Sequence, residues 1–541
     1  MRRWLRGLGA LLALALAYCP GAQAAVPSFA ELEAAQARIA RVIVRPLDIF
    51  DTEDPRESNP LFRLANALHV TTRRAVIERS LLFRAGDRVQ VRLIEETERL
   101  LRNARFLYDV SIRPVAVNEQ GEVDIEVLTR DTWSLDPGLS FGRSGGANTS
   151  SLSLHEYNLL GTGFNVSVGR SNTVDRSGTE FQVGTERLGG SWTALSLAHA
   201  QNEDGQRSAV RLVRPFYALD SRWAAGFSAS RDDRIDSIYQ AGEPVQRYRR
   251  QEDRAEVFGG LSEGLVDGWV ERWSVGLLAE RDGYAVEPGE VPPAQLAPNE
   301  TRVGPFVRWE RIEDQVDTVR NLMQIGRPEY LPMGWRWTGQ LGAALTGMGA
   351  TREALLYAGR VSRGLVPAPG QRLMLAGSVE GRLTDAGIER QKLSATGQWF
   401  KPWSEGTVTY VGAAADLLTQ PGPLDMLTLG GDNGLRGYPL RYQNGTQRAL
   451  FSVEQRFYTD FFPFRLFRVG AAGFADVGRA WGGIHAGPTS ERWLADVGVG
   501  LRIFSVRSAF NNALHIDLAM PVNPDAGVKR VQLLVKTRLS F

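Results

Sequence analysis

The sequence is almost without cysteine, since its 541 residues contain one, Cys19. That residue falls in an N-terminal stretch with early arginines, an apolar run over Leu8–Tyr18 and the small-residue site Ala22-Gln23-Ala24. The pattern is typical of a secretory signal peptide and predicts that residues 1–24 are removed during export. An exported chain without cysteine forms no disulfides, so it must be stabilised by burial or by the closure of a sheet.

An excess of one charge and a long apolar run are both missing after this stretch. The whole chain has 63 Lys and Arg against 61 Asp and Glu. This balance does not favour nucleic acid as a partner. A run of about 18 apolar residues, which a membrane-spanning helix requires, does not occur. A transmembrane β-barrel is still possible, because its strands face lipid with every second residue only.

Motifs that carry chemistry are scarce as well. Residues Gly142–Gly146, GRSGG, match the G-x-S-x-G pattern of a nucleophile turn. A hydrolase has a helix directly after that turn, whereas an alternating segment follows here. The five histidines are scattered, and no two have the spacing of metal ligands. We therefore expect no enzyme activity, no catalytic residue, no cofactor and no metal site.

Residues 38–131 have a mixed pattern of helix and strand. The best helix is 91–107, where apolar residues recur at helical spacing and Glu95–Arg99 is a favourable i,i+4 pair. A small periplasmic α+β domain is predicted, with the order strand, helix, helix, strand, strand. Its expected elements are strands at 38–47, 108–117 and 122–129, helices at 71–83 and 91–107, and an exposed insertion at 48–60. Residues 25–37 predict a short helical segment before it.

Beyond Asp131 the pattern changes to alternation. The last segment, Val531–Phe541, is the clearest, and its length suits a spanning strand of about 9–11 residues. With about 25 residues for each strand and its connection, residues 132–541 predict an antiparallel transmembrane β-barrel of 16 strands. The alternative is a soluble β-sandwich, but a dry core would not accommodate Arg456 and Arg502, which alternate with apolar residues.

Four stretches carry a recognisable pattern. Taken in chain order, they are NLLGTGFNV (158–166), GGDNGLRGYP (430–439), GFADVGRAW (473–481), and the pair LHIDLAMPV (514–522) and LLVKTRLSF (533–541). They resemble the first hairpin, the hallmark loop, the following strand motif and the last two strands of the BamA/TamA superfamily, also called the bacterial surface antigen family. The mixed region 38–131 resembles a POTRA domain, the periplasmic unit of these proteins.

The resemblance implies an outer-membrane protein of a Gram-negative cell with a 16-stranded barrel. In such proteins the hallmark loop folds back into the lumen and its arginine docks on an acidic wall residue. The loop-lock motif here is Leu435, Arg436, Gly437 and Tyr438, with Asp476 or Glu454 as the partner of the arginine. The last strand of the family is an insertion signal, which implies that role for Leu539 and Phe541. One POTRA-like domain, at 38–131, is a minimal number for the family.

Several functions are compatible with this resemblance. The first is assembly or translocation, in which the POTRA-like domain receives a periplasmic protein or lipid substrate and the barrel inserts or exports it. The second is a passive or gated outer-membrane pore. The third is an anchor whose periplasmic domain docks a partner. Expected partners are outer-membrane lipids, an unknown periplasmic protein and the barrel assembly machinery that would insert the chain itself.

Overall fold

The computed structural model describes residues 26–325, 328–505 and 513–538. The expected signal peptide (1–24) and the expected insertion-signal residues Leu539 and Phe541 lie outside this part of the chain. The chain divides into two compact units. One contains Met1–Leu47, Ser80–Ala104 and Asp109–Arg130, and the other contains Asp48–Arg79, Arg105–Tyr108 and Asp131–Phe541.

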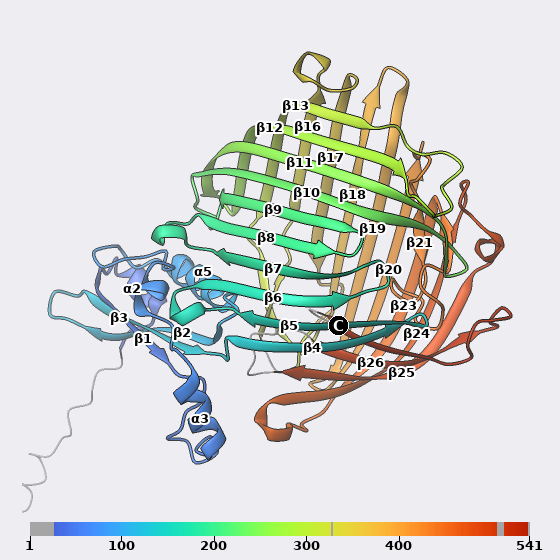
Figure 1. Ribbon diagram of the computed structural model, residues 1–541. Helices are drawn as coiled ribbons and strands as arrows, with labels where there is room; N and C mark the ends of the chain where they lie inside the picture. The colour runs from blue at the N-terminus through green and yellow to red at the C-terminus, as the bar shows by residue number, and fades with distance from the viewer. Residues whose placement is uncertain (1–25, 326–327, 506–512, 539–541) are drawn as a thin grey trace, which may run out of the picture. The chain divides into compact units, whose positions relative to one another are not determined.

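The N-terminal unit is a three-stranded sheet with helices (Figure 1). Its elements are α2 (Phe29–Ala34), β1 (Ile39–Leu47), α5 (Val91–Arg102), β2 (Leu107–Val117) and β3 (Val123–Asp131). The strand order is β1-β3-β2, and β1 runs parallel to β3. The central strand β3 is buried at Val123, Ile125 and Val127. Strands β1 and β2 are therefore the edges of this sheet.

The helices of the first 131 residues differ from the expected ones in their bounds. The helix expected over 91–107 ends at Arg102, because Leu107 already begins a strand. The segment Asp48–Arg79 belongs to the barrel unit and contains α3 (Pro60–Leu68) and α4 (Arg74–Glu78). Within the described ranges, no helix combines the length and the apolar character needed to cross a membrane.

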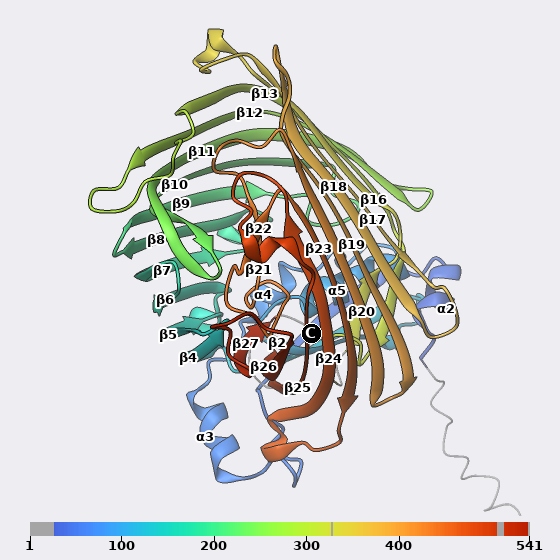
Figure 2. The same ribbon diagram turned by 90° about the vertical axis from the view of Figure 1, so that its right-hand side faces the viewer.

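The second unit is a closed barrel in which the described residues form twenty strands. Neighbours in sequence pair antiparallel around the ring, and β27 pairs with β4 (Figures 1 and 2). The strands are β4 (Leu135–Ser144), β5 (Ala147–Glu156), β6 (Phe164–Asn172), β7 (Ser177–Thr185), β8 (Ala194–Asn202), β9 (Gly205–Arg214), β10 (Trp223–Gln240), β11 (Glu243–Val266), β12 (Trp269–Val286), β13 (Glu300–Glu313), β16 (Arg336–Ala344), β17 (Ala354–Leu365), β18 (Arg372–Thr384), β19 (Gly387–Ser404), β20 (Thr407–Thr419), β23 (Gln447–Tyr458), β24 (Phe467–Trp481), β25 (Leu494–Ser505), β26 (Ala513–Val522) and β27 (Gln532–Arg538).

The expected number of 16 strands is wrong. Strands β4 to β9 have nine or ten residues each and all six fit within residues 135–214. Each of them, with its turn, takes roughly half of the residues that a long spanning strand and its loop would take. Short turns such as the one at Gly145–Gly146 make this possible, since both glycines have positive φ.

The barrel has two rims, and each carries both short turns and long connections. Rim A is the end at which β4, β6 and β8 begin, and it has the two-residue turns 267–268 and 405–406 as well as a long connection that starts at residue 314. Rim B is the opposite end, with two-residue turns at 145–146 and 241–242 and long connections at 287–299 and 420–446. The length of the connections therefore does not distinguish the two rims.

The wall is apolar outside and polar inside. Along β12, Trp273, Val275 and Leu277 are exposed, whereas Arg272 and Ser274 are buried. Exposed aromatic side chains gather near rim A, namely Trp223, Trp273, Trp337, Trp403, Phe457 and Phe464. An apolar band with an aromatic girdle matches the surface that a barrel presents to a bilayer.

Candidate functional site: a loop folded into the lumen

The connection between β20 and β23 forms the candidate site. Residues 420–446, hereafter the rim-B loop, contain β21 (Leu427–Leu429) and β22 (Gln443–Gly445), which pair antiparallel. Figure 2 shows both strands inside the ring, and the side-chain amide of Asn444 donates to the carbonyl of Tyr239 on β10. The glycine-rich stretch is therefore not an ordinary surface turn.

Local bonds give the loop its path. The side chain of Asn433 accepts from the backbone N of Gly430 at 2.7 Å and donates to the carbonyl of Thr428 at 2.7 Å. At Gly437 the backbone passes so close to the wall that a Cβ there would lie 2.6 Å from the Cβ of Asp496. Gly434 has φ +145, a region that L side chains rarely adopt. Both glycines are thus required by the path.

The apolar residues of the loop are as buried as a protein core. Leu435 and Tyr438 are 0% exposed, and they pack with Leu429, Tyr442 and Leu494. The hydroxyl of Tyr438 lies 3.2 Å from two wall carbonyls, those of residues 495 and 522, to which it can donate. This burial holds the loop against β25 and β26.

Arg436 lies at the centre of a buried ionic cluster. Its Nε and Nη2 donate to the two carboxylate oxygens of Asp476 at 2.7 and 2.8 Å. Its Nη1 donates to Oε1 of Glu454 at 2.7 Å, and the guanidinium lies over the ring of Phe474 at 3.4 Å from the centroid. Burial by itself lowers the pKa of Arg436, but the bonds to Asp476 and the nearby carboxylates raise that pKa overall. The side chain is a fixed cation.

The cluster extends along the inner wall. Arg456 Nε donates to the other oxygen of Glu454 at 3.0 Å, and Arg502 pairs with Asp517. Asp517 lies 3.7 Å from Arg436. Asp496 is a fourth carboxylate, and it is the register partner of Asp476 on the neighbouring strand. Three guanidinium groups thus meet four carboxylates, and all seven side chains are buried.

The loop also bridges the seam at which the barrel closes. Strands β27 and β4 share a single register pair, Val535 with Arg143, in the part of the chain that the structure describes. The carbonyl of Gly431 accepts from Oγ of Ser144 on β4 at 2.6 Å and from Nζ of Lys536 on β27 at 2.9 Å. One loop carbonyl is therefore bonded to both the first and the last strand.

A second connection reaches the same cluster from rim A. Residues 314–325 and 328–335, hereafter the rim-A hairpin, contain β14 (Val316–Arg320) and β15 (Pro328–Pro332). Leu322 is buried with Phe400 and Val408 of the wall. The carbonyl of Leu322 accepts from Nη1 of Arg456 at 3.0 Å. Connections from both ends of the barrel therefore meet at the pair Glu454–Arg456.

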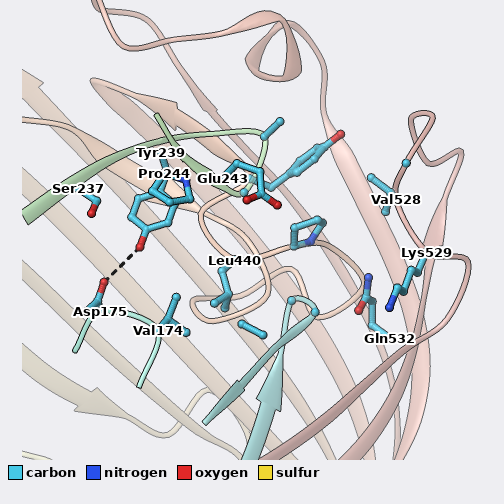
Figure 3. Close-up of a pocket in the computed structure, with 18 of the residues that line it drawn as sticks. Val174, Asp175, Ser237, Tyr239, Glu243, Pro244, Leu440, Val528, Lys529 and Gln532 are labelled. Atoms are coloured by element: carbon cyan, nitrogen blue, oxygen red, sulfur yellow. Dashed lines mark hydrogen bonds between the residues drawn. The ribbon is translucent and has the colours of Figure 1, made fainter. Parts of the chain in front are cut away.

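The rim-B loop lines a cavity of about 720 Å³ at its own rim. Leu440 faces it from the loop, while Val174 and Lys529 come from other rim-B connections and Glu243 begins β11 (Figure 3). The figure also shows the bond of 3.4 Å from Tyr239 to Asp175. The loop thus separates this outer vestibule from the ionic cluster beneath it.

The structure brings together the residues that the sequence analysis singled out for the loop. Arg436 contacts both suggested partners, Asp476 and Glu454, rather than one of them. Sequence reasoning missed Arg502, Asp517 and Lys536 as parts of this site. Their one signal in the sequence is a polar residue at an inward position of an alternating strand, and such positions are common in a polar lumen.

Comparison with known proteins gives distant structural likeness only. No family model matches the chain, and no curated protein matches its sequence. The structure of CdiB from Escherichia coli is 13% identical with a TM-score of 0.49, and the match covers 94% of this chain and 77% of that chain. BamA from Haemophilus ducreyi lacking POTRA domains 1–3 is 12% identical with a TM-score of 0.42, covering 92% and 85%. Such low scores do not by themselves establish a common fold, so the barrel rests on its strand pairing.

Proposed function

We propose that this chain is an outer-membrane protein that inserts or exports a protein or lipid substrate received by its N-terminal unit. The observation that carries the proposal is a loop that folds into the lumen and is locked there on a buried ionic cluster. A pore that passes solutes freely needs an open path, whereas the rim-B loop and the rim-A hairpin both occupy the interior next to Glu454.

The seam between the last and first strands supports the same proposal. Strand β27 pairs antiparallel with β4, with Val535 opposite Arg143, and the rim-B loop is bonded to both strands. A substrate strand could add to the edge of β4 or β27 if this contact opened, since an open edge pairs readily with another strand. The bond from Lys536 to the loop would hold the seam closed until the loop moves.

The N-terminal unit would supply the receiving site. Its strand order β1-β3-β2 leaves β2, of eleven residues, at the edge of the sheet. An extended periplasmic chain can bind such an edge by adding one strand, with main-chain hydrogen bonds giving affinity.

Planar-bilayer recordings on the full chain test the proposal. The expected result is a small and flickering conductance for the wild-type protein and a larger, steady one for Arg436→Ala. A steady large conductance of the wild type would instead identify a passive pore. Removal of residues 26–131 should leave the barrel folded but abolish complementation of a null strain. Full complementation by the truncated barrel would overturn the role of the N-terminal unit in substrate capture.

A further inference from the structure

Helix α3 turns a stripe of leucines to the outside of the protein. Leu61, Leu64 and Leu68 are 74%, 54% and 67% exposed. They recur at positions i, i+3 and i+7, so they form one stripe along the helix. None of the nine residues of α3 is buried. A helix that left this stripe in water would be unfavourable, because apolar surface is stabilised by leaving water.

The opposite side of α3 is fixed to its own unit. The side-chain amide of Asn66 accepts from the backbone N of Phe50 at 3.1 Å and donates to the carbonyl of Phe50 at 2.9 Å. Phe62 stacks on Phe50 with 4.0 Å between the ring centroids. Because these contacts fix the rotation of the helix, the leucine stripe cannot turn inward.

The segment after α3 ties the helix to rim A of the barrel. Thr72 donates from its backbone N and its hydroxyl to Asp131, at 2.7 and 2.9 Å. Asn158 in the β5–β6 turn donates to the hydroxyl of Thr72 at 2.7 Å. Figures 1 and 2 both show α3 beside the rim-A end of β4 and outside the ring of strands. The helix is thus held next to the outer wall, not over the lumen.

The surroundings of α3 indicate a lipid surface. Leu159 and Leu160, in the turn that holds Thr72, are themselves exposed, and the aromatic girdle lies at the same rim. Such a girdle marks the level of the lipid headgroups. From Pro60 to Ile77 the sequence has three arginines and no acidic residue, and all three arginines are exposed: Arg63, Arg73 and Arg74. A leucine stripe beside basic residues is the composition of a helix that lies in a membrane interface.

We propose that α3 lies on the periplasmic leaflet of the outer membrane beside β4, with Leu61, Leu64 and Leu68 inserted among anionic phospholipids. The inference rests on the proposed outer-membrane location of the barrel and on the expected periplasmic side of the N-terminal unit, whose chain leads into β4 at rim A. It adds a second membrane contact, outside the barrel wall, at the strand that borders the seam. A helix seated there would also fix the position of the Asp48–Arg79 segment at the membrane.

Depth measurements on single-cysteine variants test this inference. The sequence has its one cysteine within the expected signal peptide, so Leu64→Cys, Val275→Cys and Glu53→Cys each give one labelling site after export. Val275 on the outer wall is the reference for lipid, and exposed Glu53 is the reference for water. Each full-length variant carries an environment-sensitive fluorophore in vesicles of phosphatidylethanolamine and phosphatidylglycerol, and nitroxide lipids serve as quenchers.

The expected result is several-fold stronger quenching at position 64 than at position 53, most of it by the nitroxide at headgroup depth. Position 275 should be quenched by the nitroxide in the acyl chains. If position 64 is quenched no more strongly than position 53 while position 275 is quenched, the inference about α3 is wrong and the membrane location of the barrel stands. An unquenched position 275 would overturn the membrane location of the barrel itself. Disulfide cross-linking between two copies of the Leu64→Cys variant, or shielding of position 64 by a periplasmic extract only, would assign the stripe to a protein partner and would also overturn the inference.

Discussion

Two connections of the barrel fold inward, and they are held in different ways. The rim-B loop places its own guanidinium on carboxylates of the wall, at Asp476 and Glu454. The rim-A hairpin instead uses its own carboxylate, because Glu329 accepts from the backbone N of residues 322, 323 and 324 at 2.9 to 3.2 Å. The rim-B loop thus brings a cation to wall carboxylates, whereas the rim-A hairpin adds an internal carboxylate bond to its contacts with Arg456 and Arg372 of the wall and to its apolar packing.

The difference teaches which contact can be released. The bonds that Glu329 accepts lie within the hairpin and do not require the wall, whereas Arg436 of the rim-B loop depends on partners in other strands. An ion pair that is buried and hydrogen-bonded is strong only as a complete set, since removal of one partner leaves an uncompensated charge. The rim-B loop is thus the segment that the loss of a single ionic partner can free.

The largest expected effect is that of Arg436→Ala. It should destabilise the closed loop by about 3–5 kcal/mol, while strand pairing still forms the barrel. The open population should rise by roughly a hundredfold or more. Chymotrypsin cleavage at Leu435 and Tyr438 in vesicle-reconstituted protein measures this. Resistance equal to that of the wild type, in a variant that has lost the guanidinium, would contradict the anchoring of the loop by charge.

The next effect concerns the two partners of the arginine. Asp476→Ala should open the loop nearly as much as Arg436→Ala, and the double variant should be little worse than either one, because both remove the same contact. Glu454→Ala should have an added effect on the rim-A hairpin, since Glu454 also binds Arg456. The double-mutant cycle is read from the same protease rates. Fully additive losses for Arg436 and Asp476 would show that their contact contributes nothing.

A smaller effect is expected from Glu329→Gln, which keeps the size of the side chain but removes its charge. Hydrogen bonds to charged groups contribute about 1.5–3 kcal/mol, so the hairpin should loosen by about that much while the rim-B loop stays closed. Hydrogen exchange at the amides of residues 322–324 is the measurement. If hydrogen exchange in the rim-B loop accelerated as much as exchange in the hairpin, the two segments would not be held independently by different contacts.

Lys536→Met tests the seam and should have an effect of about 1 kcal/mol. The variant removes the bond to the carbonyl of Gly431 and leaves Arg436 in place. We expect β27 to separate from β4 more often. The measurement is the rate at which a disulfide forms or is reduced between cysteines introduced at positions 535 and 143, and this rate should rise. An unchanged rate would assign the closure of the seam to strand pairing alone.

The smallest effect is expected from Arg231→Ala. Arg231 pairs with Asp253 at 2.6 Å, but its side chain is 69% exposed. Exposed ion pairs contribute little because water and salt screen them, so both inward segments should keep their protease resistance. This variant is the matched control for Arg436→Ala, since each removes one paired arginine. Equal effects of the two would show that burial is not what makes the pair at Arg436 strong.

The sequence allowed a barrel to be predicted but not its size. Alternation in segments such as Val531–Phe541 depends only on which face meets lipid, and this is local information. The number of strands depends on how tightly the chain turns, and turns such as Gly145–Gly146 shorten the spacing of β4 to β9 far below the average. A count from mean spacing therefore gave 16 where the described chain has twenty.

The candidate site was predictable where two signals coincide. Arg436 stands in a loop near the apolar residues Leu435 and Tyr438, and Glu454 and Asp476 fall at inward positions of the two barrel strands that follow this loop. Lys536 and Glu329 carry no such signal. Their roles depend on closure of the ring, which brings β27 to the loop, and on a hairpin that folds inward from the other rim. Both are long-range contacts that periodicity does not encode.

The chain of bonds from Leu322 through Arg456 and Glu454 to Arg436 makes the two ends of the barrel thermodynamically linked. If displacement of the hairpin weakens the bond between Glu454 and Arg436, the rim-B loop loses a certain free energy of closure. By thermodynamic linkage, release of the loop then destabilises the hairpin by the same free energy. A ligand that binds at rim A would then be reported at rim B without passing through the lumen. The coupling can be measured as the ratio of the affinities at one rim with and without a ligand at the other rim, and this ratio must be the same in both directions.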